Sequence, residues 1–152
     1  MFGKMSGDRV AVQSNRMYTL KAVMDSSIRG AQTDIGALAS KDANTAAVMI
    51  WNYHDDDIQG PAEPINLQIA HIPAKTVMMT HYRIDDKHSN SYEVWKKMGS
   101  PKNPTKTQIS TLEKAGQLES MGKQEKLKVE NNILVLNITL PRQGVSLIKL
   151  DW

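Results

Sequence analysis

Hydrophobic and polar residues alternate with a period of two in several short stretches of the chain. In residues 63–72, Ile65, Leu67 and Ile69 alternate with polar side chains. This period is typical of a strand that buries one face. The same alternation predicts three further strands, at residues 125–130, 132–140 and 145–152.

Residues 45–54 show a different pattern, because both faces of the predicted strand are apolar. Val48 and Ile50 lie on one face, and Met49 and Trp51 lie on the other. A strand of this kind is covered on both sides, so it is predicted as a central strand with Trp51 packed in the core. Further strands are predicted at residues 18–28, 34–40 and 75–85, the last as the partner of the central strand.

Turn signals separate these strands. Residues 41–44 link two strands at hairpin distance, and residues 130–132 do the same because asparagine tolerates the left-handed conformation. Further breaks contain glycine or proline, at residues 60–61, 72–73 and 141–144. About eight short strands with this spacing predict a mostly β fold, an antiparallel β-sandwich or jelly roll.

One stretch, residues 88–121, changes to helical spacing. Tyr92, Trp95 and Met98 recur every third residue after N-cap candidates at residues 89 and 90, and Gly99 begins the break that stops this helix. A second helix is predicted from Thr105 or Thr107, with the apolar face and the C-terminal stop formed by Ile109, Leu112, Ala115 and Gly116. An insertion of ~30 residues is long for a sandwich connection, so we expect it to do more than join strands.

The composition is that of an ordinary globular domain, with 40% hydrophobic and 23% charged residues in 152. The net charge of +3 comes without an arginine stripe, so no nucleic-acid partner is expected. No run of about 18 apolar residues exists, so no membrane partner is expected either. The absence of cysteine excludes disulfides, thiolate metal sites and a cysteine nucleophile.

His54, Asp55, Asp56 and Asp57 directly follow the central strand. Adjacent carboxylates repel one another, so a cation is expected nearby, supplied by Arg83, by Lys87 or by a neighbouring domain. Three interpretations remain open: a structural loop or domain contact, the rim of a sugar site, or a hard metal site such as calcium. The spacing of the carboxylates is not that of a calcium loop.

A second polar cluster lies at the end of residues 75–85 and contains His81, Arg83, Asp85 and His88. Histidine and aspartate are metal ligands, but their spacing here matches no strong metal motif. The remaining interpretations are an ion-paired strand end and a surface that contacts a partner domain. A small enzyme built on both polar clusters would require the two strand ends to converge.

The glutamates do not suggest an independent glycosidase. That chemistry needs two facing carboxylates, one of them in an apolar setting that raises its pKa. None of the six glutamates has such a setting in the sequence: Glu63, Glu93, Glu113, Glu119, Glu125 and Glu130. The chain also lacks a nucleophile elbow and a phosphate-binding glycine loop. We therefore expect that it is not a catalyst by itself, and no metal or cofactor is expected.

Several runs of residues resemble the family 39 glycoside hydrolases, and their bacterial β-xylosidase branch more than the α-iduronidase branch. The His-Asp-Asp-Asp run at 54–57 and the Met-Gly-Ser-Pro run at 98–101 are the more specific ones. The similarity covers nearly the whole chain in order, through residues 1–10, 36–40, 48–57, 80–85, 88–92, 95–101 and 140–147.

The resemblance implies a retaining enzyme with a (β/α)₈ barrel followed by a β-sandwich, both catalytic glutamates lying on the barrel. Neither glutamate motif occurs here. Residues 1–152 are therefore expected to form one accessory domain, in which residues 1–8 are a remnant of the connection to a catalytic barrel. The implied partners are that barrel and neighbouring subunits, with carbohydrate bound only through the parent enzyme.

The resemblance also implies that the helical insertion approaches the active-site rim. Trp95 is expected to be the exposed aromatic of the insertion. The candidates for a domain contact or for the rim are His54, Asp55, Asp56, Asp57, His81, Arg83, Asp85, His88, Tyr92, Trp95 and Met98. The alternative function is a carbohydrate-binding module for xylan-type sugars, although three Trp, four Tyr and one Phe are few for stacking platforms.

Overall fold

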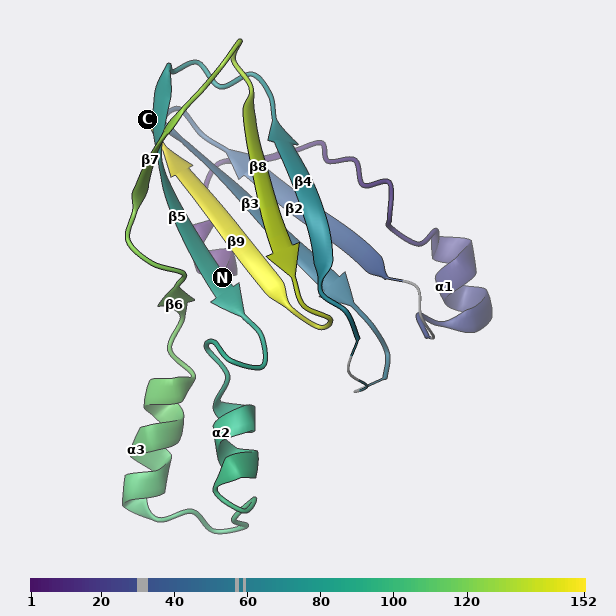
Figure 1. Ribbon diagram of the computed structural model, residues 1–152, viewed down its shortest axis with the longest axis vertical. Helices are drawn as coiled ribbons and strands as arrows, with labels where there is room; N and C mark the ends of the chain where they lie inside the picture. Colours follow the sequence, from purple (N-terminus) through teal and green to yellow (C-terminus); the bar gives the residue numbers. More distant parts are fainter. Residues whose placement is uncertain (30–32, 57, 59) are drawn as a thin grey trace.

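The computed structural model describes residues 1–29, 33–56, 58 and 60–152, which fold into two antiparallel sheets and a helical hairpin (Figure 1). The elements follow one another as η1 (Phe2–Lys4), β1 (Asp8–Val10), α1 (Leu20–Ser26), β2 (Asp34–Lys41), β3 (Thr45–Tyr53), β4 (Glu63–Ile69), β5 (Thr76–Ile84), α2 (Ser91–Lys97), α3 (Lys106–Ala115), β6 (Glu119–Ser120), β7 (Glu125–Lys128), β8 (Leu134–Leu140) and β9 (Val145–Asp151).

The large sheet has the strand order β1-β2-β3-β9-β5-β6, with β7 also paired to β5, and β4 and β8 form a small second sheet. The predicted mostly β, antiparallel sandwich is therefore confirmed. The predicted pairing of β5 with β3 is wrong, because β9 lies between them. Val145 of β9 stands opposite Trp51 on one side and opposite Ile84 on the other.

The core lies between the two sheets, on what we call the inner face of the large sheet. Ile50, Leu140, Ile148 and Leu150 are fully buried there, and partly buried residues of the small sheet such as Leu67 pack against them. The strict alternation predicted for β4 is confirmed, since its partly buried residues alternate with exposed ones. One-sided burial of this kind lets the small sheet cover the core and face water at once.

The opposite, outer face of the large sheet is also apolar. Met49, Leu147 and partly buried Trp51 belong to a separate cluster on this face. Both faces of β3 are therefore apolar as predicted, but Trp51 does not reach the full burial predicted for a core residue. The Trp51 ring lies against Gly36 of β2, where a Cβ atom would meet the ring at about 2.5 Å. Only glycine leaves room for this packing.

The two predicted helices of the insertion are confirmed as α2 and α3, which form a hairpin projecting from one end of the large sheet (Figure 1). The Asn90 side chain caps α2. Thr105 and Gln108 form a reciprocal capping box at the start of α3, and Gly116 is its C-cap. No helix within the described ranges has the length and apolarity that crossing a bilayer requires.

The strand predicted at residues 18–28 is wrong, because α1 occupies Leu20–Ser26 with Thr19 as its N-cap. Apolar residues recur there with a period of two, but Leu20, Val23 and Met24 also satisfy the helical spacing. No residue of α1 is buried, so no sheet face was available to select the extended form. Local capping decides the structure instead.

The turn at residues 130–132 has the predicted left-handed asparagines, with φ of 51° at Asn131 and 61° at Asn132. Glu130 and Ile133 form a single bridge across it. The strands on either side then diverge, because β7 pairs with β5 and β8 pairs with β4. The turn therefore connects the two sheets rather than two partners in one sheet.

Candidate functional site: two polar clusters at one end of the sandwich

The two predicted polar clusters lie at the same end of the large sheet. Strands β3 and β5 are both antiparallel to β9, so they run in the same direction on either side of it. Residues 54–57 follow β3, and residues 81–88 cover the end of β5 and the loop after it. The strand ends are thus close, with the start of β9 between them.

Asp85 is the centre of the cluster after β5. Its side chain is 4% exposed, and its Oδ1 accepts hydrogen bonds from the backbone N–H groups of Lys87 at 2.8 Å and His88 at 2.9 Å. The Nδ1 atom of His88 lies 2.8 Å from the same oxygen. Burial raises the pKa of Asp85, but the hydrogen bonds from Lys87 and His88 outweigh it and hold the pKa below its usual value.

Arg83 joins this cluster to the small sheet. Its Nη1 lies 3.6 Å from Asp85 Oδ2, and its Nη2 donates a hydrogen bond to the Thr139 carbonyl at the end of β8. Burial lowers the pKa of Arg83, and the neighbouring Asp85 charge partly offsets that effect. The hydrogen bond from Arg83 to Thr139 therefore links the two sheets at this end of the sandwich, and the ion pair with Asp85 holds the guanidinium in place.

Partly buried His81 and fully buried Ser146 form a pair beside Arg83. His81 Nε2 lies 3.0 Å from Ser146 Oγ, and burial, followed by the charges of Arg83 and His88, lowers the pKa of His81 to about 4. The ring is consequently neutral at pH 7. Ser146 is fully buried, so its hydroxyl cannot meet a substrate as a nucleophile despite the histidine beside it.

The same cluster anchors the base of the helical hairpin. Asn90 Nδ2 donates to the Asp85 carbonyl at 2.9 Å, and Ser89 Oγ donates to the Arg83 carbonyl at 2.8 Å. Ser89 Oγ in turn accepts from the backbone N–H of Glu119, where the chain returns from α3. Both ends of the hairpin are therefore fixed to β5.

His54 leads the second cluster and is 2% exposed. Arg142 Nη1 lies 3.2 Å from His54 Nε2. The backbone N–H of Asp56 donates to His54 Nδ1 at 3.1 Å, and the Asp56 carbonyl lies 3.1 Å from the same nitrogen. Gln143 Nε2 donates to that carbonyl. These contacts tie the loop after β3 to the turn between β8 and β9.

The carboxylates of this loop have partners other than the predicted ones. Asp55 Oδ2 accepts from the Ile28 N–H at 2.5 Å and its Oδ1 accepts from the Tyr53 hydroxyl at 3.1 Å. Asp56 Oδ1 lies 4.0 Å from Arg29 Nε. Arg83 pairs with Asp85 instead, so the prediction that it serves this loop is wrong. The Asp55 hydrogen bond and charge raise the pKa of Tyr53. Asp57 lies outside the described residues.

The hairpin residues have unequal exposure. Tyr92 is 56% exposed and stacks on Trp95 with ring centroids 5.6 Å apart. Trp95 and Met98 are both partly buried. The Trp95 Nε1 atom donates a hydrogen bond to the Pro101 carbonyl at 3.1 Å, and Met98 lies at the end of α2. Tyr92, rather than Trp95, therefore presents the more exposed aromatic ring of the insertion.

The glutamates do not have the surroundings of a glycosidase acid. All six glutamates are described and none is buried, so none has the apolar setting that raises the pKa of a glycosidase acid. Glu63 pairs with Arg16, and Glu93 pairs with Lys96. Among the described residues, no group of three or more histidine, aspartate or glutamate side chains is placed to hold a metal ion.

Sequence reasoning missed Arg142, Ser146 and Ser89, which complete the two clusters. Arg142 lies in a turn that proline and glycine marked only as a break. Its role depends on the β8–β9 turn lying beside the loop after β3, a contact across 88 positions. Ser146 occupies a position in the alternating pattern of β9 where a core residue is expected. That pattern was the only sequence signal for its burial.

Comparison with known families shows the class of protein to which this β-sandwich belongs. The family model of glycosyl hydrolases family 39 matches residues 7–124. The chain belongs to glycosyl hydrolase family 39.

Individual relatives show how much of their own length the chain spans, and the solved structures share its fold. A β-xylosidase from Geobacillus stearothermophilus is 28% identical over 111 residues, which are 73% of this chain and 21% of that protein. The family 39 enzyme from Xanthomonas axonopodis pv. citri superposes with a TM-score of 0.64 at 18% identity, over 80% of this chain and 28% of that one. A monomeric β-xylosidase from Caulobacter crescentus CB15 gives 0.64 at 20% identity, over 76% and 26%.

Proposed function

We propose that this chain is the non-catalytic accessory domain of a β-xylosidase-like family 39 glycoside hydrolase, packed on a catalytic (β/α)₈ barrel. One observation carries the proposal. The chain belongs to the family yet spans only 21% of the xylosidase it matches, and none of its glutamates lies in a buried setting. The catalytic acid and nucleophile then belong to the remaining part of such an enzyme.

Within that role, the hairpin of α2 and α3 supports the active-site rim or the assembly of subunits. The buried Asp85 cluster fixes both ends of the hairpin, so its tip is held in a defined direction. Tyr92, stacked on Trp95, is the side chain that the hairpin offers to a partner. An ordered aromatic side chain loses little conformational entropy on contact, which favours it as an interface anchor.

The test compares the chain alone with the chain combined with its family 39 catalytic portion. We expect no hydrolysis of a chromogenic β-xyloside and no calorimetric binding of xylose or xylan by the chain alone, and hydrolysis by the combination. Tyr92→Ala should change KM or the oligomeric size of the combination. Val135→Ala, at a residue 50% exposed on the small sheet, is the matched control.

Hydrolysis by the chain alone would overturn the proposal. Sugar binding by the chain alone would replace it with the carbohydrate-binding module. If Tyr92→Ala leaves both KM and oligomeric size as in Val135→Ala, the hairpin is not the contact, although the accessory role would stand.

A further inference from the structure

The outer face of the large sheet is an apolar surface that the small sheet does not cover. Its centre is formed by Ala47, Met49 and Leu147, which are themselves buried. The N-terminal segment covers part of it, because Met1 and Met5 pack on this cluster and the Lys4 ammonium lies 4.8 Å from the centre of the Tyr82 ring. A second part of this face lies over β2 and the Trp51 end of β3.

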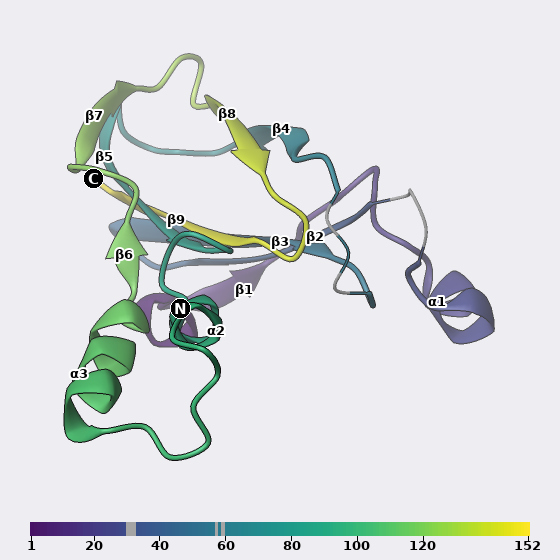
Figure 2. The ribbon, with the colours of Figure 1, turned by 60° about the horizontal axis from the view of Figure 1, so that its bottom comes forward.

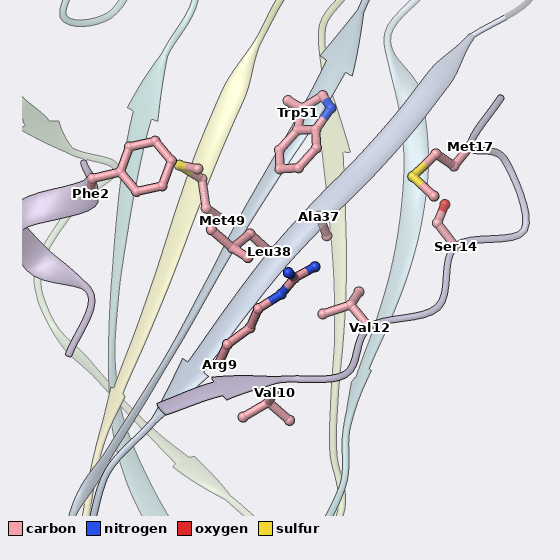
Figure 3. Close-up of a pocket in the computed structure, with 10 residues that line it drawn as sticks. All are labelled: Phe2, Arg9, Val10, Val12, Ser14, Met17, Ala37, Leu38, Met49 and Trp51. Carbon is pink, nitrogen blue, oxygen red and sulfur yellow. The ribbon is translucent and has the colours of Figure 1, made fainter. Parts of the chain in front are cut away.

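A groove of about 320 Å³ lies there, between the N-terminal segment and strands β2 and β3 (Figure 3). Its floor includes Leu38, Met49 and Trp51. Its other wall carries large apolar side chains that are exposed to water: Phe2 (66%), Val10 (41%), Val12 (38%) and Met17 (56%). Exposed apolar side chains gathered in one groove mark a binding surface, whereas isolated ones are ordinary.

Among the described residues, Arg9 is the one charged residue that lines the groove, and it extends between Leu38 and Val12 (Figure 3). The described residues offer Arg9 no ion pair or hydrogen bond from its guanidinium. A partner that fills the groove would remove water from this cation, and a desolvated guanidinium requires a carboxylate opposite it. The surface therefore selects an apolar partner that carries an acidic residue.

The outer face of the small sheet shows the opposite character. Asn66 Nδ2 donates to Asn137 Oδ1 at 2.9 Å, and Gln68 Nε2 donates to Asn66 Oδ1 at 3.1 Å. Side-chain amides that bond one another along exposed strands suit a surface that stays in water. The two broad faces of the sandwich are thus chemically distinct, and the apolar one is on the large sheet.

We propose that the outer face of the large sheet, with the groove between the N-terminal segment and β2–β3, docks on the catalytic portion of a family 39 enzyme, with a carboxylate of that portion opposite Arg9. This inference rests on the proposed accessory function. The chain spans between 21% and 28% of the relatives named above, so a much larger body is the natural occupant. Figure 2 shows the N-terminal segment and the hairpin on the same side of the large sheet, away from β4 and β8. One body on that side would meet the groove and the hairpin together.

The experiment measures binding of the 152-residue chain to the catalytic portion of the family 39 enzyme from the same organism, produced as a separate polypeptide, by calorimetry. The test variant Val12→Glu/Met17→Glu changes residues that are 38% and 56% exposed. The matched control Ile133→Glu/Val135→Glu adds the same charge at residues that are 39% and 50% exposed on the other side of the sandwich. Circular dichroism and thermal unfolding confirm that each variant folds.

We expect the test variant to bind about tenfold or more weakly, because charges placed in an apolar interface are desolvated without partners. The control should bind as the unchanged chain does. Arg9→Glu should also weaken binding, and high salt should weaken binding of the unchanged chain more than binding of Arg9→Glu. Loss of binding in the control but not in the test variant would overturn the assigned face and leave the accessory function intact. No binding by the unchanged chain would overturn the accessory function itself.

Discussion

The two polar clusters at the end of the sandwich contain the same residue types, but their carboxylates differ in burial. In the cluster after β5, the Arg83 and Asp85 side chains are 6% and 4% exposed and bond to one another. In the loop after β3, Asp55 is exposed, and Asp56 is 41% exposed with its cation 4.0 Å away. Removal of one partner from a buried ion pair strongly lowers the stability of the fold, whereas at the surface water solvates the charge that remains.

The difference teaches which cluster determines the shape of the domain. The buried cluster holds the ends of β5, β8 and the helical hairpin through hydrogen bonds that have no substitute in the interior. The exposed carboxylates mainly tie the loop after β3 to the segment after α1. Histidine and aspartate in a short run therefore do not indicate the same role in both places.

The largest expected effect comes from Asp85→Ala. The substitution leaves Arg83 buried without its carboxylate and removes the acceptor for the N–H groups of Lys87 and His88. We expect the free energy of unfolding to fall by about 3 kcal/mol, measured by urea denaturation at pH 7. Asp86→Ala is the control, because Asp86 is exposed, and it should change stability by less than about 0.5 kcal/mol. Equal changes in the free energy of unfolding would contradict the proposed difference between buried and exposed carboxylates.

A smaller effect should appear when the pH is lowered. The folded-state pKa of His81, about 4, lies below its usual value of 6.5, so the unfolded chain takes up the proton first. Stability contributed by neutral His81 is complete above pH 6.5 and is lost as the pH falls toward 4. Because the ring is only partly buried, we expect a loss of roughly 1–2 kcal/mol by pH 4.

The measurement is urea denaturation at pH 7, 5 and 4 for the unchanged chain and for His81→Gln. The variant should lack this part of the pH dependence. Asp85, whose pKa is lowered, contributes in a separate window, since its stabilisation is present above its unfolded value of 3.8 and is lost only as the pH falls below it. An identical pH profile in His81→Gln would mean that another group titrates between pH 6.5 and 4.

The smallest effect concerns the exposed cluster and is spectroscopic. Asp55 accepts the Tyr53 hydroxyl proton and its charge opposes the phenolate, so it raises the pKa of Tyr53. Asp55→Asn should lower that pKa toward 10.0, as followed by ultraviolet absorbance during an alkaline titration. Tyr53→Phe identifies the contribution of this residue among the four tyrosines. A titration that does not change in Asp55→Asn would show that the hydrogen bond is not kept in solution.

Much of the fold could be predicted because burial leaves a regular signature in the sequence. The alternation in β4 and β8 and the caps at Asn90 and Thr105 are local patterns with local causes. The position of β9 could not be predicted in this way, since strand order depends on contacts between residues far apart in the chain. Helix α1 was missed because its apolar residues fit both periods and no buried face chose between them.

The candidate site was predicted less completely than the fold. For His81, Arg83, Asp85 and His88 the sequence left two interpretations open, an ion-paired strand end and a partner-domain surface, and the structure brings the four residues together. Arg142 was missed because its partner His54 lies 88 positions away. Local sequence patterns carry no information on such a pair. The roles of the hairpin and of the outer face are properties of a surface, and surfaces are assembled only by the complete fold.

The position of β9 also has a consequence for the order in which the molecule can fold. Residues of β9 pair with β3 from Thr45 to Trp51 and with β5 from Met78 to Ile84, so β9 is the only hydrogen-bonded link between these two halves of the large sheet among the described strands. During synthesis, β2–β3 and β5–β7 emerge from the ribosome before β9 does, with open strand edges turned toward one another. Closure by a late, sequence-distant strand is slow, because the entropy of closing long loops must be lost before the strand pairs. Nascent chains therefore expose two unpaired strand edges until β9 has been made, and such edges are prone to pair with other chains.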